Sequence, residues 1–219
     1  HDDKVKKQEG APVLFEHAGA AGGYIDRLGY PYCRGRIMGK LELDNGQYDS
    51  PARIFWATGA CLLTRTALYK EAGGLDADFF AHMEEIDLCW RAQLAGYKVF
   101  NVPQSCIYHI GGGTLSNESP FKLKLNYRNN LLLLENNLAQ RIGSKRARIV
   151  FGIRKCLDCC AGFVYTLNGK KEYARSVKEA HKEFKELRHG FPKGKRTSGK
   201  IDGLNKGFIF VKSLVNRDI

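Results

Sequence analysis

The 219-residue sequence contains no apolar run of 18 residues and no stretch with the pattern of a signal peptide. A membrane-spanning helix is therefore not expected. A phosphate-binding loop is also lacking, because Gly22-Gly23 has no strand before it and no Gly-Lys-Ser/Thr after it. Neither paired Cys and His ligands nor interleaved aromatic and basic strands are present, so we expect no nucleic-acid partner.

Acidic residues are in deficit, with 23 Asp and Glu against 35 Lys and Arg, which gives a net charge of +12. This surplus suits anionic lipids or phosphorylated substrates without choosing between them. Cysteine occurs in an odd number, seven, mostly within apolar runs, which is typical of reduced thiols that serve as small hydrophobic residues. Cys156 and Cys159 have the spacing of a redox or zinc pair, but no second ligand pair accompanies them, so we expect no metal site there.

The clearest chemical feature is an acidic group within residues 79–91, FFAHMEEIDLCWR. Glu84, Glu85 and Asp87 lie in the first turn of a helix predicted over 83–95. Apolar neighbours desolvate such carboxylates and raise their pKa, which is what a general base requires. The alternative is structural, because acidic residues also stabilise the positive end of a helix dipole.

Motifs on both sides of this acidic group follow in a fixed order. They are residues 58–65 (TGACLLTR), 73–76 (GGLD), 84–91 (EEIDLCWR) and 96–97 (GY), then Pro103 and His109. Their order and spacing resemble the second half of the family 2 inverting glycosyltransferases, especially the bacterial, rhamnosyltransferase-like enzymes that build surface polysaccharides. The resemblance is close over residues 50–115 and loose over 1–140.

The resemblance implies an α/β fold, the C-terminal part of a GT-A (Rossmann-like) glycosyltransferase domain followed by a basic α-helical appendage. We expect residues 1–140 to form the acceptor-side half of that domain, 141–189 an amphipathic helical hairpin, and 190–219 a basic linker with an apolar tail. Residues 1–10 are polar and lack the strand–Gly–helix unit that opens the family's nucleotide-binding half. We therefore expect that half to be absent from the chain, and the chain alone to have little or no transferase activity.

The family's E-D-x-D pattern assigns the catalytic roles. Glu85 stands where the family has its catalytic Asp, and helical spacing turns it about 100° from Glu84 toward a more apolar side. Glu85 is therefore the expected general base, with Glu84 as the second candidate. Asp87 completes the motif and is the third residue expected to belong to the catalytic group, and Arg91, four residues further on, is its i,i+4 neighbour of opposite charge.

The resemblance also implies binding and metal-ligating roles. The residues expected to contact the donor or the acceptor are Trp56, Thr58, Gly59, Ala60 and Arg91. For Trp56, packing in the core is an equal alternative. His109 is the expected metal ligand, for a Mg²⁺ or Mn²⁺ ion held mostly by residues outside this chain. Asp76-Ala77-Asp78 reads as a helix cap and turn, because it follows a Gly-Gly pair and no apolar strand.

Residue patterns predict the remaining elements. They are a buried strand over 53–64, a short helix over 66–72, short strands over 97–102 and 105–108, and a leucine-rich helix over 121–138. The polar residues 126–130 of the last helix are expected to face the acceptor or the membrane.

The region after residue 141 is basic and amphipathic in both expected helices, 146–166 and 170–187. Such helices suit the surface of an anionic membrane. Packing on the domain, or on a sister chain in a homo-oligomer, is the equal alternative. Residues 190–207 are expected to be a flexible linker.

The function expected from this resemblance is the transfer of a sugar, with inversion, from a nucleotide-sugar to a saccharide or a lipid-linked saccharide in cell-surface polysaccharide synthesis. The expected location is the cytoplasm or the inner face of the cell membrane. The alternative is a non-catalytic binding or assembly module, in which the carboxylates are structural and the basic helices hold a membrane or a partner.

Overall fold

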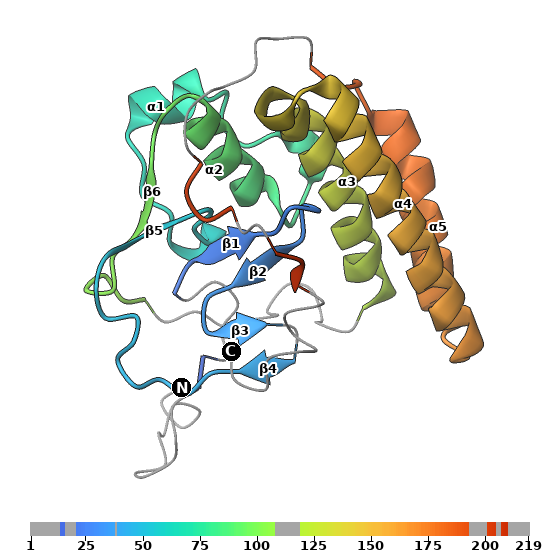
Figure 1. Ribbon diagram of the computed structural model, residues 1–219, viewed down its shortest axis with the longest axis horizontal. Helices are drawn as coiled ribbons and strands as arrows, with labels where there is room; N and C mark the ends of the chain where they lie inside the picture. The colour runs from blue at the N-terminus through green and yellow to red at the C-terminus, as the bar shows by residue number, and fades with distance from the viewer. Residues whose placement is uncertain are drawn as a thin grey trace.

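The computed structural model describes residues 14–15, 21–37, 39–107, 119–192, 201–204 and 207–209. The strands are β1 (Gly23–Ile25), β2 (Pro31–Cys33), β3 (Arg36–Ile37), β4 (Lys40–Leu41), β5 (Ala52–Ile54) and β6 (Val99–Asn101). The helices are α1 (Thr66–Glu71), α2 (Glu84–Leu94), α3 (Pro120–Ile142), α4 (Ser144–Leu167) and α5 (Lys171–Leu187), with short 3-10 turns η2 (Gly59–Cys61) and η3 (Ala77–Phe79). The described part is mixed α/β, with α1 and α2 above strands β1 to β4 and the long helices α3, α4 and α5 beside them (Figure 1).

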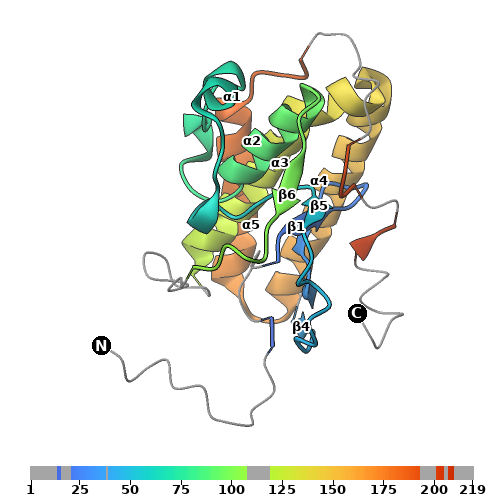
Figure 2. The ribbon, with the colours of Figure 1, turned by 90° about the vertical axis from the view of Figure 1, so that its left-hand side faces the viewer.

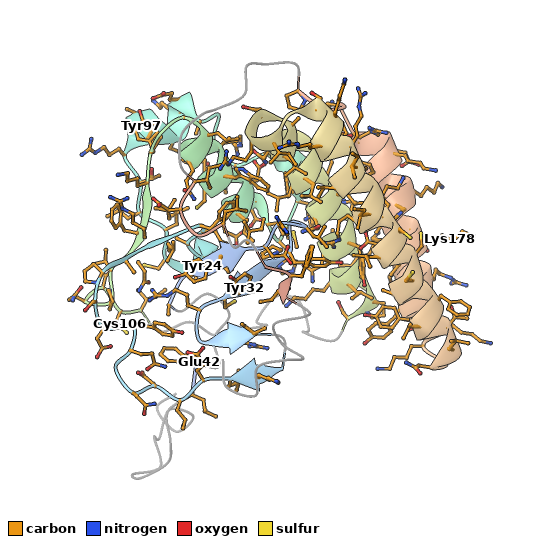
Figure 3. The ribbon with its side chains drawn as sticks, viewed as in Figure 1. Tyr24, Tyr32, Glu42, Tyr97, Cys106 and Lys178 are labelled. Carbon is orange, nitrogen blue, oxygen red and sulfur yellow. The ribbon has the colours of Figure 1, made fainter. Side chains whose placement is uncertain are left out.

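Strands β1 to β4 form an antiparallel meander in sequence order. Tyr24 pairs with Tyr32 across β1 and β2, and their rings lie 5.8 Å apart on one face of the sheet (Figure 3). Strands β5 and β6 pair antiparallel as a second sheet. Every strand pairing within these two sheets is thus antiparallel, and the fold is compatible with part of a glycosyltransferase domain.

Gly23 joins the two sheets. Its N–H donates to the Trp56 carbonyl at 3.0 Å, and its own carbonyl accepts from Phe55 N–H at 2.8 Å. A side chain at position 23 would meet the Trp56 ring, because a Cβ there would lie 2.0 Å from Trp56 Cε2. Trp56 is consequently buried, and its indole N–H donates to the Tyr24 carbonyl.

The strand predicted over 53–64 is much shorter in the structure. Strand β5 ends at Ile54, and residues 59–61 form η2 at the surface. Leu63 is 96% exposed. The prediction was wrong because a continuous apolar run does not tell a buried strand from a loop that carries apolar side chains to the surface.

The helices flanking this loop agree with the prediction. Helix α1 ends before Gly73 and Gly74, which both have positive φ, and α2 ends before Gly96, whose φ is +97°. These glycines adopt the left-handed conformation that closes a helix at low steric cost. In α2 the ring of Trp90 packs edge-on against Phe55, with the centroids 5.2 Å apart, and this contact fixes the helix on the sheets.

Helix α3 is the central element of the core. Residues 131–134 are all buried, because α2 covers one side of α3 and helices α4 and α5 cover the other (Figure 2). The polar residues expected to face an acceptor or the membrane lie inside instead, since Arg128, Asn129 and Asn130 are buried and donate hydrogen bonds to backbone carbonyls or to each other.

Helices α4 and α5 pack against each other and, through α3, on the rest of the described structure. The apolar side of α5 is buried there, including Val177, Ala180 and Phe184. For α5 the structure therefore supports packing on the domain over contact with a membrane. No helix in the described ranges is long and apolar enough to cross a membrane.

Two further predictions differ from the structure. Residues 105–107 form no strand, and residue 108 lies outside the described part. Residues 201–204, expected in a flexible linker, instead lie against β1: Leu204 forms a bridge with Ile25, and the Asp202 N–H donates to the Gln93 side-chain oxygen at 2.8 Å. The basic, glycine-containing composition had suggested a flexible linker, and composition does not report such backbone pairing.

Candidate functional site

The loop that leads into α2 has an unusual backbone. Phe80, His82 and Met83 have positive φ values of 59°, 70° and 73°. Residues other than glycine rarely adopt this region, and each such conformation costs free energy that the surrounding structure must offset. The side chain of Phe80 is 74% exposed, so packing of its ring does not offset that cost.

Helix α3 holds this loop in place through two buried side chains. The Asn129 amide N–H₂ donates to the carbonyls of Phe79, Ala81 and His82 at 2.9, 2.7 and 2.7 Å. The neighbouring Arg128 also donates to the Phe79 carbonyl, at 2.8 Å. Because the contacts are to backbone oxygens, they fix the path of the loop and hence the position at which α2 begins.

The loop delivers Glu84 and Glu85 to the uncapped end of α2. Met83 precedes the helix without a side-chain cap, and the Glu85 carboxylate accepts from backbone N–H groups of the first turn, at the positive end of the helix dipole. Glu85 lies next to the surface turn η2, because its Cβ is 3.9 Å from the point where a Cβ on Gly59 would stand. Gly59 and Glu85 belong to two of the motifs that follow each other along the sequence, and the structure brings these two residues close together.

Glu85 has the properties of a carboxylate held ready to take up a proton. Burial raises its pKa from 4.5 to about 7, and the negative charge of Glu84 adds to the rise. Backbone hydrogen bonds, including those from Gly59 and Ile86, oppose it. A carboxylate with such a pKa is partly ionised near neutrality and accepts a proton more strongly than an exposed glutamate does.

Several polar atoms around Glu85 are buried without a partner. Within the described ranges, Glu85 Oε2, Glu84 Oε2 and His82 Nε2 make no hydrogen bond. Burial lowers the pKa of His82, and the charge of Lys122 lowers it further. Buried polar atoms without partners are costly and cluster where a ligand or water supplies the missing hydrogen bonds.

Asp87 and Arg91 have a different role from Glu85. The Asp87 carboxylate is fully buried and accepts from Arg91 Nε and Asn137 Nδ2, both at 2.6 Å. The Arg91 guanidinium also donates to the Ala72 carbonyl and, at 2.7 Å, to that of Gly74. The two i,i+4 neighbours therefore form an ion pair, and it ties α2 to the glycine turn that follows α1.

Other residues predicted to contact the donor or the acceptor occupy the surface or the core. Gly59 and Ala60 are exposed in η2, and Thr58 caps that turn by accepting from the Ala60 N–H at 3.4 Å. Trp56 is only 6% exposed, as expected if it packs in the core. Little of its ring is left for a sugar to contact. The binding roles of Thr58, Gly59, Ala60 and Arg91 remain predictions.

His109, the expected metal ligand, lies outside the described residues. Among the residues that are described, no group of three or more His, Cys, Asp or Glu side chains is placed to hold a metal ion. Asp76 caps η3 by accepting from the Asp78 N–H at 3.0 Å, as its sequence context indicated. The cysteines that we expected to be reduced are free, but only Cys89 among them is buried.

Sequence reasoning missed three residues of this site. Asn129 and Arg128 lie almost 50 residues from the loop that they hold, so no local pattern connects them to it. For His82 the sequence contained a weak indication, because the residue lies between the apolar Phe79-Phe80 pair and the acidic motif. In the structure its side chain is partly buried and lies near the charge of Glu84.

Comparisons with known proteins place a segment of the chain near one class of enzymes. A segment of 56 residues, 26% of this chain, is 36% identical to the N-acetylglucosaminyl-diphospho-decaprenol L-rhamnosyltransferase of Mycobacterium tuberculosis (strain H37Rv). A segment of 66 residues, 30% of the chain, is 30% identical to the rhamnosyltransferase WbbL of Escherichia coli (strain K12). Part of this chain is similar to bacterial rhamnosyltransferases.

The extent of this similarity is limited. The matched segments cover 18% and 25% of the length of these two relatives. No protein-family model matches the chain. No solved structure matches it either.

Proposed function

We propose that this chain provides the acceptor side of an inverting glycosyl-transfer site used in cell-surface polysaccharide synthesis, with Glu85 as the general base. The observation that carries the proposal is the placement of Glu85, a desolvated carboxylate with a pKa of about 7 directly beside the exposed backbone of η2. The partial similarity to rhamnosyltransferases supports the reaction class.

In the proposed reaction, Glu85 removes the proton from a hydroxyl group of the acceptor sugar. The acceptor oxygen forms a bond to the anomeric carbon of the nucleotide-sugar as the bond to the nucleoside diphosphate breaks on the opposite face, which inverts the configuration. The diphosphate leaves with the bonding electron pair, and Glu85 later returns its proton to water. A base with a pKa near the working pH is suited to this transfer.

The surface beside Glu85 is formed by small, exposed residues. Gly59 and Ala60 are exposed and carry little or no side chain, so an acceptor can approach the backbone of η2 closely. The acceptor in this proposal is a saccharide or a lipid-linked saccharide. His82 Nε2, buried and unpartnered within the described ranges, is available to hydrogen-bond a second hydroxyl of the same sugar.

The proposal includes a Mg²⁺ or Mn²⁺ ion, which would be held by His109 together with residues outside this chain. When bound, such an ion would neutralise the charge on the departing diphosphate. The described carboxylates and histidines do not form a metal site by themselves. No step above depends on the ion, and the proton transfer is assigned to Glu85 alone.

The test is Glu85→Gln in the native protein that carries these residues. Gln keeps the size and the hydrogen-bond acceptor but cannot take a proton, so turnover should fall by about 10²- to 10⁴-fold, the usual contribution of a general base. In the unchanged protein, the rate should rise with pH and level off above about pH 7, where Glu85 is ionised.

The matched control is Glu84→Gln, the same chemical change one residue earlier. It should retain most of the turnover, because Glu84 only adds negative charge near the base. Loss of turnover in the Glu84 variant with retention in the Glu85 variant would move the base to Glu84. Full turnover in both variants would show that neither carboxylate is the base. It would end the proposal and support a non-catalytic role for this part of the protein.

A further inference from the structure

Helix α4 presents an apolar face that nothing in the described structure covers. Six large apolar side chains of α4 are between 38% and 69% exposed, namely Ile149, Ile153, Leu157, Phe163, Val164 and Leu167. Cys156 and Cys160 lie between them and are exposed as well. Monomeric proteins rarely leave so many large apolar side chains exposed along one element.

Helical spacing places these side chains in one continuous stripe. With about 100° per residue, they fall within a sector of about 120° that runs the length of the helix. The opposite side of α4 is the one that packs on the domain, because Ala147, Phe151, Arg154 and Asp158 are buried there. The exposed stripe is therefore a second, separate apolar face and not the edge of the core.

The charges around this face are almost entirely positive. Lys145, Arg146 and Arg148 are exposed on the first turns of α4. The helix has one acidic residue, Asp158, which is buried and accepts from Arg154 and contacts His181 Nε2 at 3.2 Å. The exposed side of α4 thus combines apolar and basic residues and has no acidic ones.

From this arrangement we infer that the exposed face of α4, here called the α4 face, lies on the surface of an anionic lipid bilayer. An amphipathic helix with this composition inserts its apolar side chains between lipid headgroups while its basic residues meet lipid phosphates. A second copy of the chain fits less well: a parallel pairing of two α4 helices places their basic first turns opposite each other, and an antiparallel pairing leaves those basic residues without an acidic partner on α4. Helix α5 provides the contrast, since its apolar side is buried and its outer side mixes acidic and basic residues.

This inference concerns where the protein works and does not depend on the proposed reaction. Binding can be measured without a substrate, by co-sedimentation of the chain with vesicles of phosphatidylcholine and phosphatidylglycerol and with vesicles of phosphatidylcholine alone. We expect binding to the anionic vesicles at least tenfold tighter than to the neutral ones, and weaker binding at high salt.

Two sets of variants test the two parts of the α4 face. Ile153→Glu with Phe163→Glu should lower vesicle affinity at least tenfold, while the same change at two exposed apolar residues elsewhere, Leu43→Glu with Val102→Glu, should not. Replacing Lys145, Arg146 and Arg148 by Gln should weaken binding about 100-fold, because each basic residue near an anionic surface contributes roughly fivefold.

The matched control for the charge change is on α5. There, Lys178, Lys182 and Lys185 are exposed, and Lys178 points away from the domain (Figure 3). Replacing these three lysines by Gln should leave most of the binding intact, and circular dichroism identifies any variant that does not fold. If an inserted Glu prevents folding, the comparison of the Gln variants of α4 and α5 still tests the inference.

Three results would overturn the inference. The first is equal vesicle binding by the parent chain and the folded α4 variants. The second is an equal loss of binding for the α4 and α5 lysine sets. The third is a dimer, measured by light scattering, that the Ile153→Glu, Phe163→Glu variant abolishes while the parent chain binds no vesicles, and it would assign the α4 face to a second copy of the chain.

Discussion

Replacing Glu85 by Gln should stabilise the folded chain at alkaline pH at the same time as it removes the proposed base. The physical reason is the cost of holding a charged carboxylate in surroundings that solvate it poorly. In the folded state the pKa of Glu85 is about 7, against 4.5 for an ordinary glutamate. The folded state therefore binds a proton more tightly than the unfolded state does.

The direction and the size of the effect follow from this difference. A group whose pKa is raised on folding contributes its full stability below the unfolded pKa and loses it as pH rises through the folded pKa. The difference between about 7 and 4.5, at 1.36 kcal/mol per pH unit, corresponds to about 3 kcal/mol. Gln does not titrate, so the stability gained by Glu85→Gln should grow from near zero at about pH 4 to about 3 kcal/mol at about pH 8.

The assay is urea unfolding of the parent chain and the variant over this pH range, followed by circular dichroism. Only the difference between the two proteins is interpreted, because other groups titrate in both. Glu179→Gln on the exposed side of α5 is the matched control for the chemical change from Glu to Gln. A Glu85 difference that is flat with pH, or that has the opposite sign, would refute the reasoning that Glu85 is desolvated in the folded state.

Three further predictions concern the residues that position the site. Asn129→Ala should lower the free energy of unfolding by about 2 kcal/mol, because the two amide hydrogens that serve three loop carbonyls are lost at about 1 kcal/mol each; Asn136→Ala, which removes one long contact of 3.4 Å, should cost much less in the same urea titration. Arg91→Ala leaves the Asp87 carboxylate buried without its ion pair and should cost about 3–5 kcal/mol, and an unchanged urea midpoint would contradict the assigned role. Gly203→Ala should release residues 201–204, because the new Cβ would stand 2.4 Å from a backbone nitrogen of the core and φ there is +72°; faster amide exchange of the Asp202 N–H would report this, and unchanged exchange would contradict it.

Local patterns in the sequence were sufficient to predict the helices. Periodic apolar residues and terminal glycines placed α1, α2 and α3 within a few residues of their observed ends. The ion pair between Asp87 and Arg91 followed from their spacing of four residues. These features depend on neighbours within one or two helical turns, so the sequence contains the information directly.

The parts that could not be predicted depend on contacts between distant segments. The left-handed residues before α2 are held by Asn129, almost 50 positions away, and no nearby glycine signals their backbone conformation. Trp56 could be read as a sugar platform or as a core residue until the position of Gly23 was known. The exposure of Leu63 could not be predicted either, because the residue type alone does not say whether another segment will cover an apolar side chain.

The docking of residues 201–204 has a consequence for how the protein is made. The hydrogen bonds between Gln93 and Asp202 span 109 positions, and that between Asp26 and the Ile209 N–H spans 183. Contacts this remote form late, because the intervening chain must be ordered first. During synthesis, before residues 201–204 have left the ribosome, the edge of β1 that they cover is still open, and this is the interval in which a chaperone would protect it.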